Sequence, residues 1–323
     1  MMEKKQTHEY FSFYRAFESQ DVLRQKLEEE YRLRGASSKE ALEWSYRNTP
    51  VFHYEWLIGR TYWEEALHAS LMTRPLLLFY GLAHLLKGIT LISDPHYPAS
   101  TDVLAHGITS RKRKKKDYTF LQDEIKVQKR GFFPHFSQLL FHMKHPYGEK
   151  WKMRDLFFKW EDLFDLYIKI HGPAALPTIQ LETSQITVKH FPAMNEQAFQ
   201  RLKKQLEGLS ITIELIKKRT KDTALFYVED LPAEVKHYFI EKGDKLYLPP
   251  HPLPLFKLSK ISAHYLILYN LSMLCRYEGE WWGEIITQRQ TEDYSFIRYY
   301  LEMVLYNAPG LLEAFFNSRG FPQ

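Results

Sequence analysis

The spacing of apolar residues predicts helices at both ends of the chain and strands between them. Apolar residues recur at every third or fourth position from Trp56 to Leu71 and again from Met153 to Ile168, as in amphipathic helices. Two segments, Leu76–Ile92 and Ser259–Arg276, are apolar on almost all sides. A helix with that pattern is buried on several sides, so we expect both segments to lie in the core.

Prolines and glycines predict where the elements end. A helix that starts at Ser37 or Ser38 is expected to stop before Pro50. Near the C-terminus, Phe296–Val304 and Pro309–Phe316 are predicted as separate helices. Residues 94–134 contain several helix breakers and are expected to be irregular, with a strand at Tyr118–Leu121.

The period of the pattern changes to two in the middle of the chain, which predicts strands. The predicted strands are Thr178–Leu181, Gln185–His190, Leu209–Leu215, Ala224–Val228 and Lys245–Leu248. We therefore predict an α+β fold that is predominantly helical. Residues 1–175 and 251–323 would form one helical bundle, with a small antiparallel sheet inserted at residues 176–250.

Composition excludes several classes of protein. Hydrophobic residues make up 45% of the 323 residues and charged residues 26%, which is typical of a folded domain rather than a disordered chain. The single cysteine, Cys275, rules out a disulfide framework and fits a reducing compartment. Residues 1–10 lack the apolar stretch of a secretory signal, and Leu76–Ile92 carries His84 and Lys87. We expect a cytoplasmic protein that does not span a membrane.

The basic character of the chain is local. The net charge is +5, from 44 Lys and Arg against 39 Asp and Glu, and six of these cations form the run Arg111–Lys116. Removing the run leaves 38 cations against 39 acids, a balance of −1. Clustered cations can bind phosphates of a nucleotide or RNA, whereas a solvated loop is the structural alternative.

No strong catalytic motif is present. The sequence has no phosphate-binding loop of the GxxxxGK[ST] type, no GxGxxG, no GxSxG and no HExxH. His142 and His145, with His135 seven residues before His142, are expected to be a chance grouping rather than a metal site. We therefore predict no metal and no cofactor, and we favour a binding role over catalysis.

The polar groups of the two apolar helices are the candidate ligand-binding residues. Tyr80, His84 and Lys87 lie at i, i+4 and i+7, on one helix face. The structural alternative is that His84 and Lys87 pair with acids of a neighbouring helix, and that Arg276 interacts with its helix dipole. If the two helices are neighbours, the candidate site for an anion comprises Tyr80, His84, Lys87, His106, Arg111 and Arg276.

Three segments resemble the YaaC-like family of Firmicutes: RPLLLFYGLAHLLKGITLI, LAHGITSRKRKK and YNLSMLCRYEGEWW. The resemblance covers nearly the whole chain and implies no established activity. Genes of this family often neighbour that of IMP dehydrogenase, which implies a role in purine nucleotide metabolism and that enzyme as a protein partner.

The helical part also resembles HEPN domains, many of which are metal-independent ribonucleases with an R-x(4–6)-H motif on a helix. Arg130 and His135 have that spacing, although Gly131 and Pro134 predict that no regular helix forms there. Our first hypothesis is a non-catalytic binding or regulatory protein for a nucleotide-like anion or a partner enzyme. The alternatives are a HEPN-like ribonuclease or RNA-binding protein, and a structural subunit.

Overall fold

The computed structural model describes residues 10–110, 119–145, 147–171 and 258–319, and the backbone of six strands between residues 178 and 248. The chain divides into two compact units. Unit 1 joins Met1–Lys150 to Ile261–Gln323, and unit 2 is Trp151–Lys260. The predicted domain boundaries at 175–176 and 250–251 lie outside the described residues and stay predictions.

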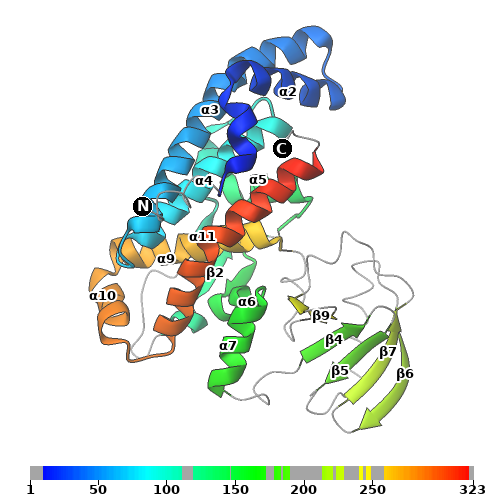
Figure 1. Ribbon diagram of the computed structural model, residues 1–323, viewed down its shortest axis with the longest axis vertical. Helices are drawn as coiled ribbons and strands as arrows, with labels where there is room; N and C mark the ends of the chain where they lie inside the picture. Colours follow the sequence, from blue (N-terminus) through cyan, green and yellow to red (C-terminus); the bar gives the residue numbers. More distant parts are fainter. Residues whose placement is uncertain are drawn as a thin grey trace. The chain divides into compact units, whose positions relative to one another are not determined.

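Unit 1 is mainly helical, in agreement with the predicted class (Figure 1). Strands β1 (Ile108–Ser110) and β2 (Glu124–Val127) pair antiparallel, and β3 (Lys150–Lys152) extends their sheet in the order β1-β2-β3. The helices and 3-10 turns are η1 (Ser12–Glu18), α2 (Gln20–Leu33), α3 (Ser38–His68), α4 (Arg74–Ser93), η2 (Thr101–Leu104), η3 (Phe120–Gln122), α5 (Phe132–Phe141), α9 (Lys260–Tyr277), α10 (Gly279–Gln288) and α11 (Asp293–Ser318).

Unit 2 contains two short helices and a six-stranded antiparallel sheet. The helices are α6 (Met153–Phe157) and α7 (Glu161–His171). The strands are β4 (Thr178–Glu182), β5 (Gln185–Lys189), β6 (Ile213–Thr220), β7 (Thr223–Val228), β8 (Ile240–Lys242) and β9 (Lys245–Leu248), in the sheet order β6-β7-β5-β4-β9-β8. The predicted antiparallel sheet is thus confirmed, but β6 is described only from Ile213, four residues later than its predicted start.

The prediction of one helix through Met153–Ile168 is wrong. Backbone bonds from Lys159 N to Leu156 O and from Trp160 N to Phe157 O tighten the chain to three residues per turn between α6 and α7. This tighter turn buries both aromatic side chains, Phe158 and Trp160, which a regular helix would separate onto different faces.

Prolines end neither of the two long helices, contrary to prediction. Helix α3 starts at a capping box, in which Ser37 Oγ accepts the Glu40 N–H and Glu40 accepts the Ser37 N–H. It then continues through Pro50, and α11 likewise continues through Pro309. Each proline removes one backbone bond, whereas burial of apolar residues on both sides of it keeps the helix intact.

The region between α4 and α5 is more regular than predicted. The expected strand at Tyr118–Leu121 is wrong, because Phe120–Gln122 forms the 3-10 turn η3 and the strand β2 follows it. Both backbone N–H groups at the start of this turn are bound by Asp293 of α11: Phe120 N–H at 2.7 Å and Leu121 N–H at 3.2 Å. The buried carboxylate thus fixes the turn against the C-terminal helix.

Helices α2 and α3 are held together by buried contacts. Tyr31 of α2 donates its hydroxyl to Leu91 O of α4 and accepts a hydrogen bond from the Asn48 side-chain amide of α3, at 3.0 and 2.9 Å.

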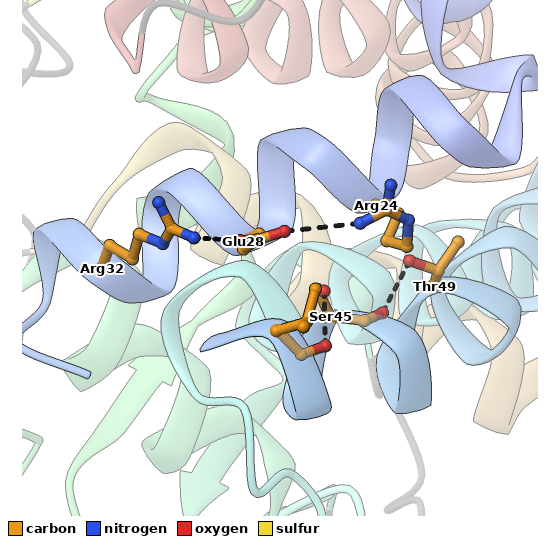
Figure 2. Close-up of polar contacts among 6 residues, drawn as sticks. Arg24, Glu28, Arg32, Ser45 and Thr49 are labelled. Atoms are coloured by element: carbon orange, nitrogen blue, oxygen red, sulfur yellow. Dashed lines mark hydrogen bonds and ion pairs between the residues drawn. The ribbon is translucent and has the colours of Figure 1, made fainter. Parts of the chain in front are cut away.

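The polar contacts in Figure 2 stay within single helices. On α2, Glu28 lies between Arg24 and Arg32. On α3, the Ser45 and Thr49 hydroxyls donate to carbonyls of the preceding turn. Ion pairs within one helix contribute little to stability, so α2 is held on α3 mainly by its buried side chains.

Aromatic rings join the two ends of the chain. Tyr14 of η1 stacks on Trp56 of α3 with ring centroids 4.4 Å apart, and Phe316 of α11 meets the same indole at 5.3 Å. Trp63 donates its indole N–H to Leu305 O at 3.2 Å. The C-terminal helices therefore pack on the N-terminal ones, as the sequence predicted (Figure 1).

Helix α4 is buried on most of its surface. In the described part of the chain it is the one helix that is long and apolar enough to cross a membrane, but 72% of its apolar 18-residue segment is buried inside the fold, as in the core helix of a soluble domain.

Helix α4 approaches α3 closely through glycines. A Cβ atom at Gly81 would lie 3.1 Å from Gly59 O, and one at Gly88 would lie 2.3 Å from the Trp56 ring.

Replacing Gly88 by alanine should therefore destabilise the protein by about 1–3 kcal/mol, because the new methyl group overlaps a fully buried indole that has no room to move. Urea unfolding measures the loss. The matched control is Gly310→Ala on α11, where nothing lies within 4 Å of the new Cβ and the higher helix propensity of alanine should leave stability equal or higher. Equal effects of the two substitutions would contradict the close approach of α3 and α4.

Candidate functional site

The two apolar helices predicted to be neighbours lie side by side in unit 1. The Phe79 ring of α4 has its centroid 5.4 Å from Tyr265 and 5.5 Å from Tyr269, both on α9. Further along, Arg276 Nη1 donates to the Tyr80 hydroxyl at 2.6 Å. The contacts bring polar groups of α4 and α9 to one place.

Arg276 lies in the last turn of α9 and is exposed. Its guanidinium also contacts the hydroxyl of Tyr277 and lies over that ring, 4.6 Å from the centroid. The dipole of α9 favours a cation at this position, which is the structural role expected from the sequence. The side chains that it hydrogen-bonds, Tyr80 and Tyr277, are neutral phenols, so they do not neutralise its positive charge.

His106 lies between the two helices. Its Nδ1 is 3.3 Å from the Tyr265 hydroxyl, and its ring meets Phe79 edge to face at 5.0 Å. Burial lowers the pKa of His106, and the positive charges of Lys87 and Arg276 lower it further. Lys87 and Arg276, on two different helices, are therefore both close enough to act on this imidazole.

The loop that carries His106 is held against α5. Phe132 N–H donates to Ala105 O at 2.7 Å, and Phe133 N–H donates to His106 O at 3.0 Å. Gly107 has a φ of 76° and lies against Gly131, where a Cβ atom would come within 2.2 Å of the Gly107 Cα. Because two glycines meet here, the loop can approach α5 closely enough to fix the imidazole between α4 and α9.

We call Lys87, His106 and Arg276, with the Tyr80 and Tyr265 hydroxyls, the cationic cluster. Among the described residues no carboxylate forms a hydrogen bond or ion pair with Lys87, His106 or Arg276, and the charges acting on His106 are both positive. Positive groups that gather without an acid are typical of a site that binds an anion.

His84 does not belong to the cationic cluster. Its Nδ1 lies 2.6 Å from Glu55 Oε2 of α3, and its ring stacks on Tyr62 with centroids 5.9 Å apart. His84 thus pairs with an acid of a neighbouring helix, which is the structural alternative given in the sequence analysis. Arg111, together with the rest of the run to Lys116, lies outside the described residues, so its part in the site stays a prediction.

Sequence reasoning missed the tyrosines of α9. Tyr265 and Tyr269 are one turn apart, and Arg276 follows seven residues after Tyr269, so the three share a face. Burial raises the pKa of Tyr265, and Tyr97, Tyr269 and Tyr80 act in the same direction. The Tyr265 hydroxyl therefore keeps its proton at neutral pH and can donate a hydrogen bond.

A second polar site, the polar hollow, lies at the start of α5. Its volume is about 280 Å³, and Arg130 and His135 both line it. Arg130 pairs with Asp102 at 2.5 Å, and His135 Nε2 lies 3.2 Å from Asp94 Oδ2. This contact with His135 is the largest influence that lowers the pKa of Asp94.

The prediction that no regular helix spans Arg130–His135 is correct for Gly131 and wrong for Pro134. Helix α5 begins at Phe132, with Gly131 preceding it at a φ of 132°. Pro134 falls in the first turn, where a backbone N–H has no intrahelical acceptor to lose. Arg130 thus precedes the helix and His135 lies on it.

The three histidines considered for a metal site have separate surroundings. His145 lies 2.7 Å from Ser137 Oγ and 3.0 Å from Glu149 Oε2, whereas His135 meets Asp94 and His142 ends α5. No group of three or more potential metal ligands occurs within the described ranges.

The fold and the cationic cluster define a mainly helical α+β protein in which two central helices present uncompensated positive groups. A family model described as YaaC-like Protein matches residues 15–316. The chain therefore belongs to the YaaC-like family, which confirms the resemblance of its three segments. No curated protein and no solved structure matches the chain.

Anion binding at the cationic cluster should strengthen as the pH falls. Burial and two neighbouring cations hold the pKa of free His106 below that of an ordinary histidine, and a bound anion raises it by favouring the imidazolium, so binding takes up a proton. Inorganic sulfate, whose charge is constant above pH 4, is the probe. Its affinity, measured by NMR titration, should rise between pH 8 and pH 5.5. His106→Gln should remove this dependence, and an unchanged pH profile would contradict the role of His106.

Proposed function

We propose that this YaaC-like protein is a non-catalytic, cytoplasmic binding or regulatory protein, and that the cationic cluster binds an anionic, nucleotide-like ligand. The observation that carries the proposal is the convergence of Lys87, His106 and Arg276 from three segments without an acid among their described contacts. An anion supplies the missing countercharge.

The donors of the cluster suit a phosphate group. Arg276 offers a planar fork that can bind two phosphate oxygens, and Lys87 offers a compact charge. Tyr265 and the neutral His106 are hydrogen-bonded to each other, so at neutral pH the pair leaves one proton, an O–H or an N–H, to donate to the phosphate. The Tyr277 ring, which is exposed and holds the Arg276 guanidinium over one face, provides a surface near these groups on which a base can stack.

A binding role also agrees with the sequence. None of the phosphate-transfer, dinucleotide, hydrolase-elbow or zinc-protease motifs occurs in the 323 residues. A regulatory protein can respond to a nucleotide and pass the signal to a partner enzyme. The gene neighbourhood of the family makes IMP dehydrogenase our proposed partner, and the run Arg111–Lys116 our proposed additional contact for a nucleotide or RNA.

ATP and GMP should stabilise the protein in thermal-shift assays and bind in calorimetry, whereas adenosine and guanosine should not, because they lack the anionic group. Lys87→Met and Arg276→Gln should each weaken nucleotide binding by at least about 10-fold. The matched control is Arg298→Gln, which removes an exposed arginine of α11 that pairs with Glu302 outside the cluster. Equal losses from Arg298→Gln, or no binding of either nucleotide, would contradict the proposal.

A HEPN-like ribonuclease or RNA-binding function is the second candidate, and the polar hollow favours it. Arg130 and His135 line the same hollow, and Asp94 orients the imidazole of His135. An imidazole oriented by a carboxylate is an effective general base, and an arginine can stabilise negative charge on phosphate.

If this second function operates, purified protein should cleave a mixed RNA pool without added metal. His135→Ala should then lower the cleavage rate by about 100-fold or more, because it removes the general base. Arg130→Ala should lower it through the loss of charge stabilisation, whereas Arg298→Ala, which removes an arginine of α11 outside the hollow, should have a small effect. Intact RNA after prolonged incubation with the unaltered protein would exclude catalysis at the polar hollow.

A further inference from the structure

The outward face of α3 carries an apolar surface that the fold leaves uncovered. Tyr54 is 60% exposed and Leu57 53%, and Leu42, Val51 and Ile58 are also exposed. Tyr46 is 62% exposed, with the Arg24 guanidinium of α2 over one face of its ring at 4.7 Å. The opposite face of the same helix is buried, with Phe52, Trp56 and Trp63 in the core. A helix that is apolar on both faces is expected to be covered on both. In Figure 1, α3 runs along the outer edge of unit 1.

The exposed residues form a ridge. Every fourth residue is apolar and exposed, and we call this set the α3 ridge: Leu42, Tyr46, Pro50, Tyr54 and Ile58. Ridges of i, i+4 spacing can take part in shallow crossings of about 20°, in which two long helices stay in contact along their length. The α3 ridge is thus shaped for a second helix.

The charges around the α3 ridge indicate what kind of helix would pack on it. From Asn48 to Gly59, the exposed positions of α3 carry no charged side chain. Lys39 lies before this neutral segment and Glu65 after it, and among the described residues neither side chain has an ion-pair partner. The ridge is therefore neutral in the middle. Lys39 lies toward one end, followed by the exposed Glu43 and Arg47, and Glu65 lies toward the other.

A second copy of the chain matches this arrangement. When α3 packs antiparallel on itself about a two-fold axis near residue 52, Tyr46 faces Ile58 of the second copy and Pro50 faces Tyr54. The same axis places Lys39 opposite Glu65 of the second copy, at both ends of the interface. A two-fold interface must be self-complementary, and the apolar positions of α3 and the Lys39–Glu65 pair meet that condition.

The exposed area is sufficient for association. Tyr46, Tyr54, Leu57 and Ile58, which are 41–62% exposed, together with Pro50 offer on the order of 500 Å² per copy, so a dimer would bury on the order of 1,000 Å². Two tyrosines per copy lie at the centre, and tyrosine is among the residues that contribute most to binding at interfaces.

We propose that the α3 ridge is a homodimer interface, in which two copies pack antiparallel through Tyr46, Pro50 and Tyr54 and are aligned by the Lys39–Glu65 pairs.

Light scattering during size-exclusion chromatography should give twice the chain mass of 38.6 kDa. Tyr54→Asp should convert the protein to monomer, because it places a charge at the centre of the interface. Tyr147→Asp is the matched control: it alters a tyrosine that is 66% exposed outside α3, and the dimer should persist. Circular dichroism checks that both variants are folded. A monomeric unaltered protein at micromolar concentration, or a dimer that survives Tyr54→Asp, would overturn the proposal.

Charge exchange tests the antiparallel register. Lys39→Glu should raise the dimer dissociation constant several-fold, since it places two acids opposite each other at each end. The double variant Lys39→Glu/Glu65→Lys should restore the affinity, because the pair is re-formed with reversed signs. An acid in the first turn of α3 and a base in the last both suit the helix dipole, so neither change should unfold the helix. Failure of the double variant to recover affinity would refute this register.

Discussion

The close approach of α3 and α4 is the constraint on which unit 1 depends. Gly59, Gly81 and Gly88 bring the two backbones together where any larger residue would collide with an indole, a leucine or a carbonyl. With α4 held this close to α3, its other side is free for α9, whose tyrosines surround Phe79. The position of α4 thus determines both the core and the place where the polar groups meet.

The cationic cluster follows from this packing. Lys87 belongs to α4 and Arg276 to α9, and His106 reaches them from a loop that is fixed at the start of α5. The positive charges of Lys87 and Arg276, which both disfavour a proton on His106, are held around this imidazole by the burial of their apolar neighbours. The folded state therefore has an unfavourable electrostatic free energy at the cationic cluster, and an anionic ligand lowers it on binding.

The sequence predicted those parts of the fold that depend on the period of the apolar pattern. The burial of Leu76–Ile92 and Ser259–Arg276, and the antiparallel strands, were all readable in this way. The errors concern helix ends. Pro50 and Pro309 lie inside helices because burial on both sides outweighs one lost backbone bond, and a local rule about proline contains no information about that burial.

The site was predicted in part for a similar reason. Tyr80, Lys87, His106 and Arg276 come together as expected once the two apolar helices are neighbours. His84 differs because its partner, Glu55, lies on α3, and nothing in the local sequence identifies a partner that only tertiary packing provides.

The construction of unit 1 from both ends of the chain sets the order in which the site can form during synthesis. Roughly 170 residues separate His106 from Arg276, so a ribosome that adds about 5–20 residues per second needs roughly 10–30 seconds to pass from one to the other. During that interval α3 and α4 are complete, but their aromatic surfaces lack α9 and α11. Nascent chains at this stage are therefore candidates for chaperone binding. The cationic cluster can bind a ligand only after α9, which carries Arg276, has been synthesised and has packed on α4.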